Sequence, residues 1–127
     1  MEKTITIDGR EVRFKANGNT PRLYRVLFRR DIFKDISELG DAVKIASSKS
    51  EDGEGSFIGA GSLEVFENVA YVMAKQGDPS IPSIDDWFES FETFSIYQVL
   101  PELIQLWNLT NVQISESKKN IAELTGR

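Results

Sequence analysis

After Pro21 the apolar residues of this chain recur at the spacing of an α-helix, and this periodicity restricts the fold more than any other feature. The pattern covers five segments, at about 20–30, 31–48, 63–76, 84–91 and 95–112. In the second segment, for example, Ile32, Ile36 and Leu39 fall on one helical face. Side chains three and four residues apart meet on one side of a helix, so each segment can bury a face. We expect about five helices that share one core.

The first 16 residues follow a period of two instead. Thr4-Ile5-Thr6-Ile7 and Glu11-Val12-Arg13-Phe14 alternate polar with apolar residues on either side of Asp8-Gly9. Asp-Gly between alternating segments favours a two-residue β-hairpin, because glycine accepts the positive φ that such turns need. A single hairpin is only marginally stable in water and needs another element to cover its apolar face. The sequence therefore predicts an α+β fold in which an N-terminal β-hairpin, 1–16, packs on a mainly helical body.

Length and composition favour one domain. The chain has 127 residues, of which 40% are hydrophobic and 28% charged, as in ordinary globular domains. We expect a single domain over 1–127 with its helical body at 20–112. Within that body, a stretch rich in Ser, Gly and acidic residues predicts a mobile loop at 47–62. The polar C-terminus predicts a weakly ordered tail at 113–127.

Several residues mark where the helices should begin. Thr20 before Pro21 is typical of an N-cap followed by the first helical residue. Ser83 and Asp86 match a capping box, in which the serine hydroxyl accepts a backbone N–H of the first turn. Pro101 predicts either a kink in the last helix or the start of a new one.

The composition excludes most kinds of catalytic site. The chain contains neither cysteine nor histidine. Thiol nucleophiles, Ser-His and Cys-His pairs and most zinc sites are thereby excluded, and the acidic cluster at 85–92 is accounted for by the first turn of a helix. We expect no enzymatic activity, no catalytic residue, no cofactor and no metal. Since no leader pattern or membrane-spanning segment is present, we also expect a cytoplasmic protein without a membrane partner.

Positive charge is concentrated near the N-terminus. Residues 1–34 hold nine basic and four acidic side chains, although the whole chain has a formal net charge of -5. On the first predicted helix, Arg22, Arg25 and Arg29 align on one side. This stripe is a solvated face, a patch for an acidic protein, or a self-association surface that binds the acidic part of another copy. Nucleic-acid binding by the basic segment 10–34 is a further alternative, but no recognition motif accompanies it, so we expect no nucleic-acid partner.

The last third of the chain is rich in aromatic residues, which are candidate anchors for a partner. Aromatic residues at helical spacing usually belong to the core, but one that stays at the surface is typical of an interface hot spot. We expect Trp107 to be partly exposed, because it lies near the end of its predicted helix. The candidate protein-binding residues are Arg22, Arg25, Arg29, Trp87, Phe91 and Trp107.

Three stretches of the chain carry a resemblance to a known family. Ile5-Thr6-Ile7-Asp8-Gly9-Arg10-Glu11-Val12-Arg13-Phe14-Lys15 is followed by Thr20-Pro21-Arg22-Leu23-Tyr24-Arg25 and by Arg29-Arg30-Asp31-Ile32-Phe33. This order resembles the tail assembly chaperones of long-tailed, siphovirus-type phages and prophages of Gram-positive bacteria. Leu100-Pro101-Glu102-Leu103-Ile104-Gln105-Leu106-Trp107 resembles the C-terminal helix of the same family. The chain departs from the family in its Gly/Ser-rich middle stretch and in having no C-terminal extension.

The resemblance implies a non-enzymatic assembly factor. Such chaperones coat the tape measure protein, a long chain of amphipathic helices, and recruit tail tube subunits around it. They act in the host cytoplasm and are absent from the mature virion. The partners implied are therefore the tape measure protein and the tail tube protein. The alternatives are a nucleic-acid-binding phage regulator that uses segment 10–34, and a structural component of the head–tail connector.

Overall fold

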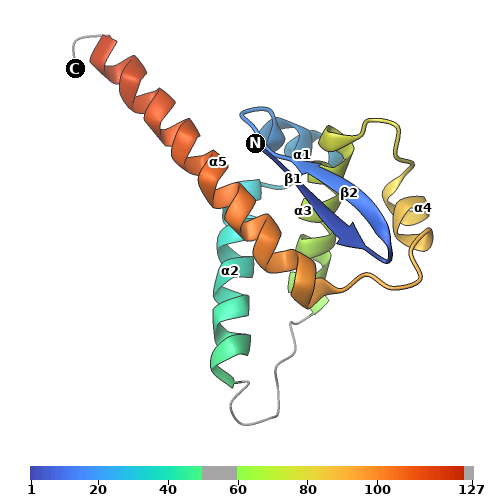
Figure 1. The fold of residues 1–127 in the computed structure, drawn as a ribbon. Coiled ribbons are helices and arrows are strands. Elements are labelled where there is room, and N and C mark those ends of the chain that lie inside the picture. The colour runs from blue at the N-terminus through green and yellow to red at the C-terminus, as the bar shows by residue number, and fades with distance from the viewer. Residues whose placement is uncertain (50–59, 125–127) are drawn as a thin grey trace.

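The computed structural model describes residues 1–49 and 60–124, with side chains described at 1–42 and 61–110. The elements follow in the order β1 (Glu2–Ile7), β2 (Arg10–Lys15), α1 (Thr20–Phe28), α2 (Ile32–Lys49), α3 (Ala60–Gly77), α4 (Ile84–Glu89) and α5 (Ile96–Leu124). Figure 1 shows the hairpin lying across α3, with α5 running past β1 and α2. The predicted fold class, an N-terminal hairpin on a mainly helical domain, is confirmed.

The hairpin forms as its alternating pattern predicts. β1 and β2 pair antiparallel with Ile5 opposite Val12, and the turn residues Asp8 and Gly9 have φ of 53° and 75°. Two consecutive positive φ values are those of the type I′ turn, whose twist matches that of the flanking strands. Ile5, Ile7 and Phe14 are buried beneath the hairpin, and Val12 is half-buried against the same core.

Helix α3 is the centre of the core because apolar residues occupy nearly every position of its middle. It contacts β2, α1, α2 and α5. The buried run is Val69, Ala70, Tyr71, Val72, Met73 and Ala74. A helix that is apolar on all sides must be surrounded by other elements. At its end, a Cβ on Gly77 would collide with the carbonyl oxygen of Arg13, so glycine is what lets β2 approach α3 this closely.

The predicted N-cap residue is correct for α4 and wrong for α1. Ser83 precedes α4 and its Oγ accepts the backbone N–H of Asp86 at 3.4 Å, as predicted for the serine of a capping box. Thr20, in contrast, is not the N-cap of α1. Asn19 holds that position, and Thr20 is the first helical residue, buried with its hydroxyl bonded to Gln76 of α3. Thr20 was therefore misassigned because its hydroxyl has a partner distant in sequence.

The boundaries predicted for the middle loop and the tail also change. Residues 47–49 belong to α2 and residues 60–62 to α3, so the loop predicted at 47–62 is wrong at both ends, and 50–59 lie outside the described residues. α5 contains Pro101 and continues as one helix to Leu124, so no new helix begins at the proline. The helical backbone thus covers most of the tail predicted at 113–127, of which 125–127 lie outside the described residues. Within the described part of the chain, no helix is long and apolar enough to cross a membrane.

Candidate protein-binding surface

The three arginines predicted as a stripe are all exposed, and α1 carries them. Arg22 and Arg25 lie within α1, and Arg29 is its C-cap. Arg29 has φ 58° and ψ 36°, and its N–H donates to the carbonyl of Arg25 at 2.8 Å. This left-handed conformation usually belongs to glycine and costs about 1 kcal/mol or more for other residues. The chain therefore keeps an arginine at a position where glycine is the less strained choice.

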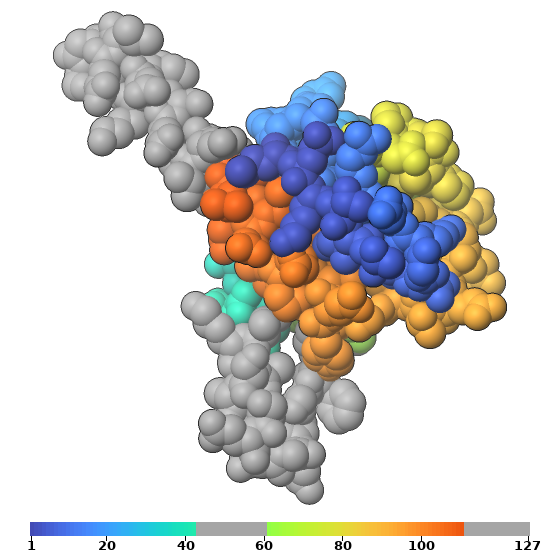
Figure 2. Space-filling model, viewed as in Figure 1, coloured from blue at the N-terminus to red at the C-terminus, as the bar shows by residue number. Residues whose placement is uncertain are grey.

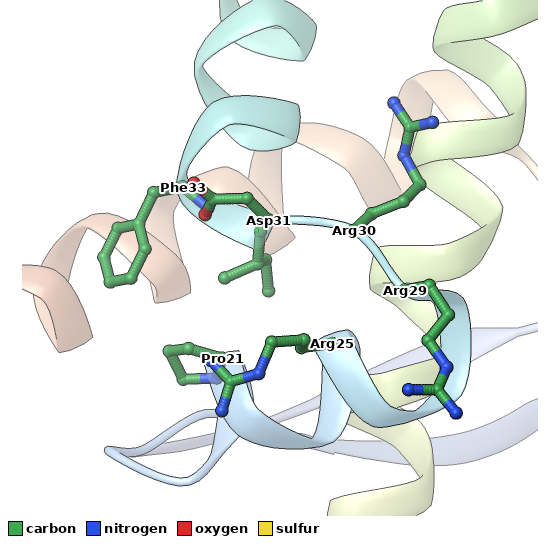
Figure 3. A pocket seen from close by; sticks show the side chains of 7 residues that line it. Pro21, Arg25, Arg29, Arg30, Asp31 and Phe33 are labelled. Atoms are coloured by element: carbon green, nitrogen blue, oxygen red, sulfur yellow. The ribbon is translucent and has the colours of Figure 1, made fainter.

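Two of the three arginines border a hollow between α1 and the start of α2. Its volume is about 490 Å³. It is lined by Pro21, Arg25, Arg29, Arg30, Asp31, Ile32 and Phe33. Figure 3 shows Pro21 and Arg25 on the α1 side and Phe33 on the α2 side. The structure thus brings Arg25 and Arg29 together around one site, whereas Arg22 lies on the same helix but does not line the hollow.

A buried carboxylate pairs with Arg30, one of the residues that line this hollow. Asp35 is 1% exposed and receives two hydrogen bonds from Arg30, Nε to Oδ2 at 2.7 Å and Nη2 to Oδ1 at 2.9 Å. The hydroxyl of Tyr24 donates to the same carboxylate at 2.6 Å. Burial by itself raises the pKa of Asp35, but the hydrogen bonds from Arg30 and Tyr24 and the charge of Arg30 outweigh it, and the pKa is lowered. Arg30 is therefore part of the framework that joins α1 to α2, and its guanidinium is already paired.

Phe33 extends the hollow into a groove. Its side chain is 39% exposed, and its ring meets that of Trp107 edge-on at 5.3 Å between centroids. On the other side of Phe33 lies a second hollow of about 330 Å³ between α2 and α5. That hollow is lined by Phe33, Ile36, Ser37, Gly40, Asp41, Ile104, Trp107 and Asn108. We call the two hollows that share Phe33 the Phe33 groove.

Two of the aromatic residues predicted as anchors, Trp87 and Phe91, are buried. The ring of Trp87 packs edge-on against those of Phe88, Phe91 and Phe94. Arg10 of β2 places its guanidinium 3.8 Å from the centre of the Phe91 ring. This cluster holds the hairpin turn against α4 and presents no free aromatic face at Trp87 or Phe91.

The expectation of a partly exposed Trp107 is wrong. Trp107 is 2% exposed, because α5 continues to Leu124 and α2 covers the indole with Phe33. Phe33 is the exposed aromatic residue next to it, and Tyr97, at the start of α5, is 61% exposed. The position of Phe33 directly after Ile32, just off the Ile32/Ile36/Leu39 face, is the sequence signal that marks it as a candidate.

Two further apolar residues are exposed on α1. Val26 is 53% and Leu27 47% exposed. Only Tyr24 and Thr20 of α1 are fully buried. Helix α1 therefore contacts the core through few residues, and its solvent-facing side carries both apolar and basic side chains.

An acidic hollow lies on another part of the molecule. It measures about 590 Å³. It is lined by Phe28, Glu67, Asn68, Ile84, Asp85, Phe88 and Glu89. Three carboxylates beside two aromatic rings give this hollow the opposite charge to the one bordered by Arg25 and Arg29. Among the residues whose side chains are described, no group of three His, Cys, Asp or Glu could hold a metal ion.

Comparisons of the chain with protein-family models, with curated proteins and with solved structures find no match. The resemblance to tail assembly chaperones therefore stays a prediction from the sequence.

Proposed function

We propose that this chain is a non-enzymatic tail assembly chaperone of a siphovirus-type phage or prophage. It binds the tape measure protein in the host cytoplasm and helps to recruit tail tube subunits. The sequence motifs quoted above support the family. The surface of α1 and α2 supports a protein-binding role.

The observation that carries the proposal is an exposed apolar surface bordered by unpaired arginines. Val26, Leu27 and Phe33 are all more than a third exposed. Arg25 and Arg29 line one hollow with Phe33, and neither makes an ion pair or side-chain hydrogen bond within the described residues. Apolar groups that gather at the surface with arginine nearby are typical of protein interfaces. A tape measure protein, whose helices need their apolar stripes covered before the tube encloses them, is a partner of matching chemistry.

Self-association is an alternative use of the surface that carries Arg25 and Arg29. The hollow with Arg25 and Arg29 and the hollow with Glu67, Asp85 and Glu89 differ in charge. The first lies between α1 and α2, and the second between α3, α4 and the end of α1. A contact between unlike surfaces repeats from copy to copy, so it can extend a row of chaperones along an elongated partner.

The experiment that tests the function is co-expression with the tape measure protein encoded by the same phage. We expect the tape measure fragment to be soluble and to co-purify with the chain, and to aggregate when expressed alone. A control with an unrelated small helical protein excludes a general effect of expression. If the fragment stays insoluble beside folded, soluble chain, the proposed function is wrong.

Nucleic-acid binding through segment 10–34 is the alternative that the exposed arginines favour. Several cations of that segment already have partners, however. Arg10 lies over Phe91 and donates to Ser90, Arg30 is bonded to Asp35, and Arg13 lies 3.8 Å from Glu2. The segment therefore offers fewer free charges to phosphates than its composition indicates.

A further inference from the structure

We propose that the Phe33 groove is the docking site for one amphipathic helix of a partner protein, whose apolar stripe ends in a cluster of carboxylates. The identity of that partner as a tape measure protein depends on the proposed function. The site itself depends on four features of α1, α2 and α5, which are its apolar lining, its rigidity, the glycine on its surface and the charges at its ends.

The centre of the groove is Phe33, which the described residues leave 39% exposed. The two hollows of the groove, about 490 and 330 Å³, meet at Phe33. Ile32 and Ile36 also line the hollows but are themselves buried, so the further apolar surface comes from the half-buried Pro21 of α1 and Ile104 of α5. Large apolar side chains at helical spacing on a partner can fill a groove of this kind, as in other helix-in-groove complexes.

Phe33 is held in place although it is exposed. Its ring packs edge-on against the buried Trp107, and the backbone N–H of Phe33 donates to Asp31 Oδ1 at 2.9 Å. Behind it, the Arg30–Asp35 pair fixes the first turn of α2. A surface that is already ordered loses little conformational entropy on binding, which favours affinity.

Gly40 gives the groove an open stretch of helix surface. It lies in the interior of α2, where glycine costs about 1 kcal/mol relative to alanine. A Cβ at this position would meet no described atom within 4 Å, so internal packing does not require glycine. Close approach of a partner backbone does require a small residue, and Gly40 faces the second hollow beside Ser37.

The charges at the two ends of the groove determine which charges a partner helix must carry and in which orientation it binds. Arg25 and Arg29 border the first hollow with guanidinium groups that no described side chain pairs, and Asp41 borders the second. A partner helix therefore places its carboxylates over the arginines and leaves uncharged or basic residues near Asp41. A nucleic acid fits this surface poorly, because its centre is apolar and Asp31 and Asp41 repel phosphates.

The test uses two labelled model peptides of about 18 residues, or five helical turns. Both carry leucines at i, i+3, i+4 and i+7, and one ends in three glutamates where the other has three lysines. Fluorescence anisotropy with the full chain measures binding. We expect the glutamate peptide to bind at least about tenfold more tightly than the lysine peptide at low salt, because of its pairing with Arg25 and Arg29. Failure of the glutamate peptide to bind below about 1 mM overturns the proposal.

Two variants locate the site without damage to the core. Gly40→Leu fills the second hollow and is a better helix former, and we expect it to weaken binding by about tenfold or more. Its matched control is Gly61→Leu in α3, where a Cβ also meets no described atom within 4 Å.

A second pair of variants tests the charges. Arg25→Glu should reverse the preference between the two peptides, whereas Arg22→Glu, outside the hollow, should not. Equal effects of Gly40→Leu and Gly61→Leu, or no reversal by Arg25→Glu, overturn the site.

Co-expression of the same variants separates this proposal from the function. If wild type and Gly40→Leu both keep the tape measure fragment soluble, the chaperone function stands and the groove is not its site. If the glutamate peptide binds the groove but wild type does not keep the tape measure fragment soluble, the proposed function is wrong and the docking site is retained.

Light scattering measures whether the chain itself forms oligomers. Wild-type oligomers that Gly40→Leu dissociates would mean that a second copy occupies the groove, which overturns the assignment to another protein.

Discussion

Arg30 holds Asp35 through two parallel hydrogen bonds, and this pairing joins the end of α1 to the first turn of α2. The geometry is the side-on arrangement in which a guanidinium meets both carboxylate oxygens. Tyr24 of α1 donates to the same carboxylate from the core side. The two helices therefore share one buried acceptor, and the hollow in front of it keeps its shape.

Removal of this acceptor should destabilise the fold. Asp35→Ala leaves the buried Tyr24 hydroxyl without its acceptor, so we expect a loss of about 1.5–3 kcal/mol in the free energy of unfolding. Urea denaturation followed by circular dichroism measures it. Glu38→Ala, at an exposed position of the same helix, is the control and should change the free energy by less than about 0.5 kcal/mol. Equal effects of the two variants would contradict a structural role for Asp35.

The same carboxylate should make stability depend on acid pH. Its pKa in the folded chain is below the ordinary value of 3.8, so the unfolded chain takes up the proton first as the pH falls. The contribution of Asp35 is therefore complete above about pH 5 and is lost as the pH falls through the folded-state pKa. We expect the difference in unfolding free energy between wild type and Asp35→Asn to shrink between about pH 5 and pH 2. A difference that stays constant over this range would show that the pKa is not lowered.

Two glycines should respond in opposite ways to alanine. Gly77→Ala would drive a methyl group into the backbone of Arg13, and we expect a loss of about 1–3 kcal/mol or more. Gly40→Ala meets open space in the middle of α2, and we expect a gain of about 0.5–1 kcal/mol. Each variant is the control of the other, because both add one methyl group to a helix. Thermal unfolding measures both, and a destabilised Gly40→Ala would mean that internal packing requires the glycine.

Substitution of Trp107 should lower the stability of the fold, because this residue belongs to the core and is not an exposed anchor. Trp107→Ala removes a fully covered indole and the ring against which Phe33 packs, so we expect a loss of about 3–5 kcal/mol. The control is Leu109→Ala, two residues further along α5 at an exposed position, which should cost less than about 1 kcal/mol. Denaturant unfolding of both variants decides the matter. Similar stabilities of the two would mean that Trp107 is not packed as described.

The parts of the fold that the sequence predicts are those in which local rules decide. Asp8-Gly9 determines the hairpin because the positive φ of both residues is a property of the turn itself. The helical face of Ile32, Ile36 and Leu39 is buried as its spacing indicates.

The errors occur where a residue's partner is distant in sequence. Thr20 bonds to Gln76, so it enters the helix instead of capping it. Trp107 is covered by Phe33 of α2, and no pattern within α5 reveals that contact. For the candidate binding surface, the sequence predicted Arg25 and Arg29, which line the hollow, but not Phe33, because which side of α2 stays open depends on where α5 crosses it.

The last prediction concerns nucleic acids, the partner class that exposed arginines most readily suggest. Binding to phosphates releases counterions, so a true nucleic-acid binder loses affinity steeply between about 50 and 200 mM salt and with each arginine removed. We expect no measurable binding to random DNA or RNA at physiological salt. Asp31 lies beside Arg25 and Arg29 and repels phosphates, and Arg10 and Arg30 already have partners within the chain.

A gel shift with wild type and with Arg22→Ala, Arg25→Ala and Arg29→Ala measures this binding. Submicromolar, salt-sensitive binding that each substitution weakens would overturn the chaperone proposal in favour of a regulator. Weak binding that appears only at low salt and is equally affected by Lys34→Ala would instead be the general attraction of a basic surface, and would leave the proposal intact.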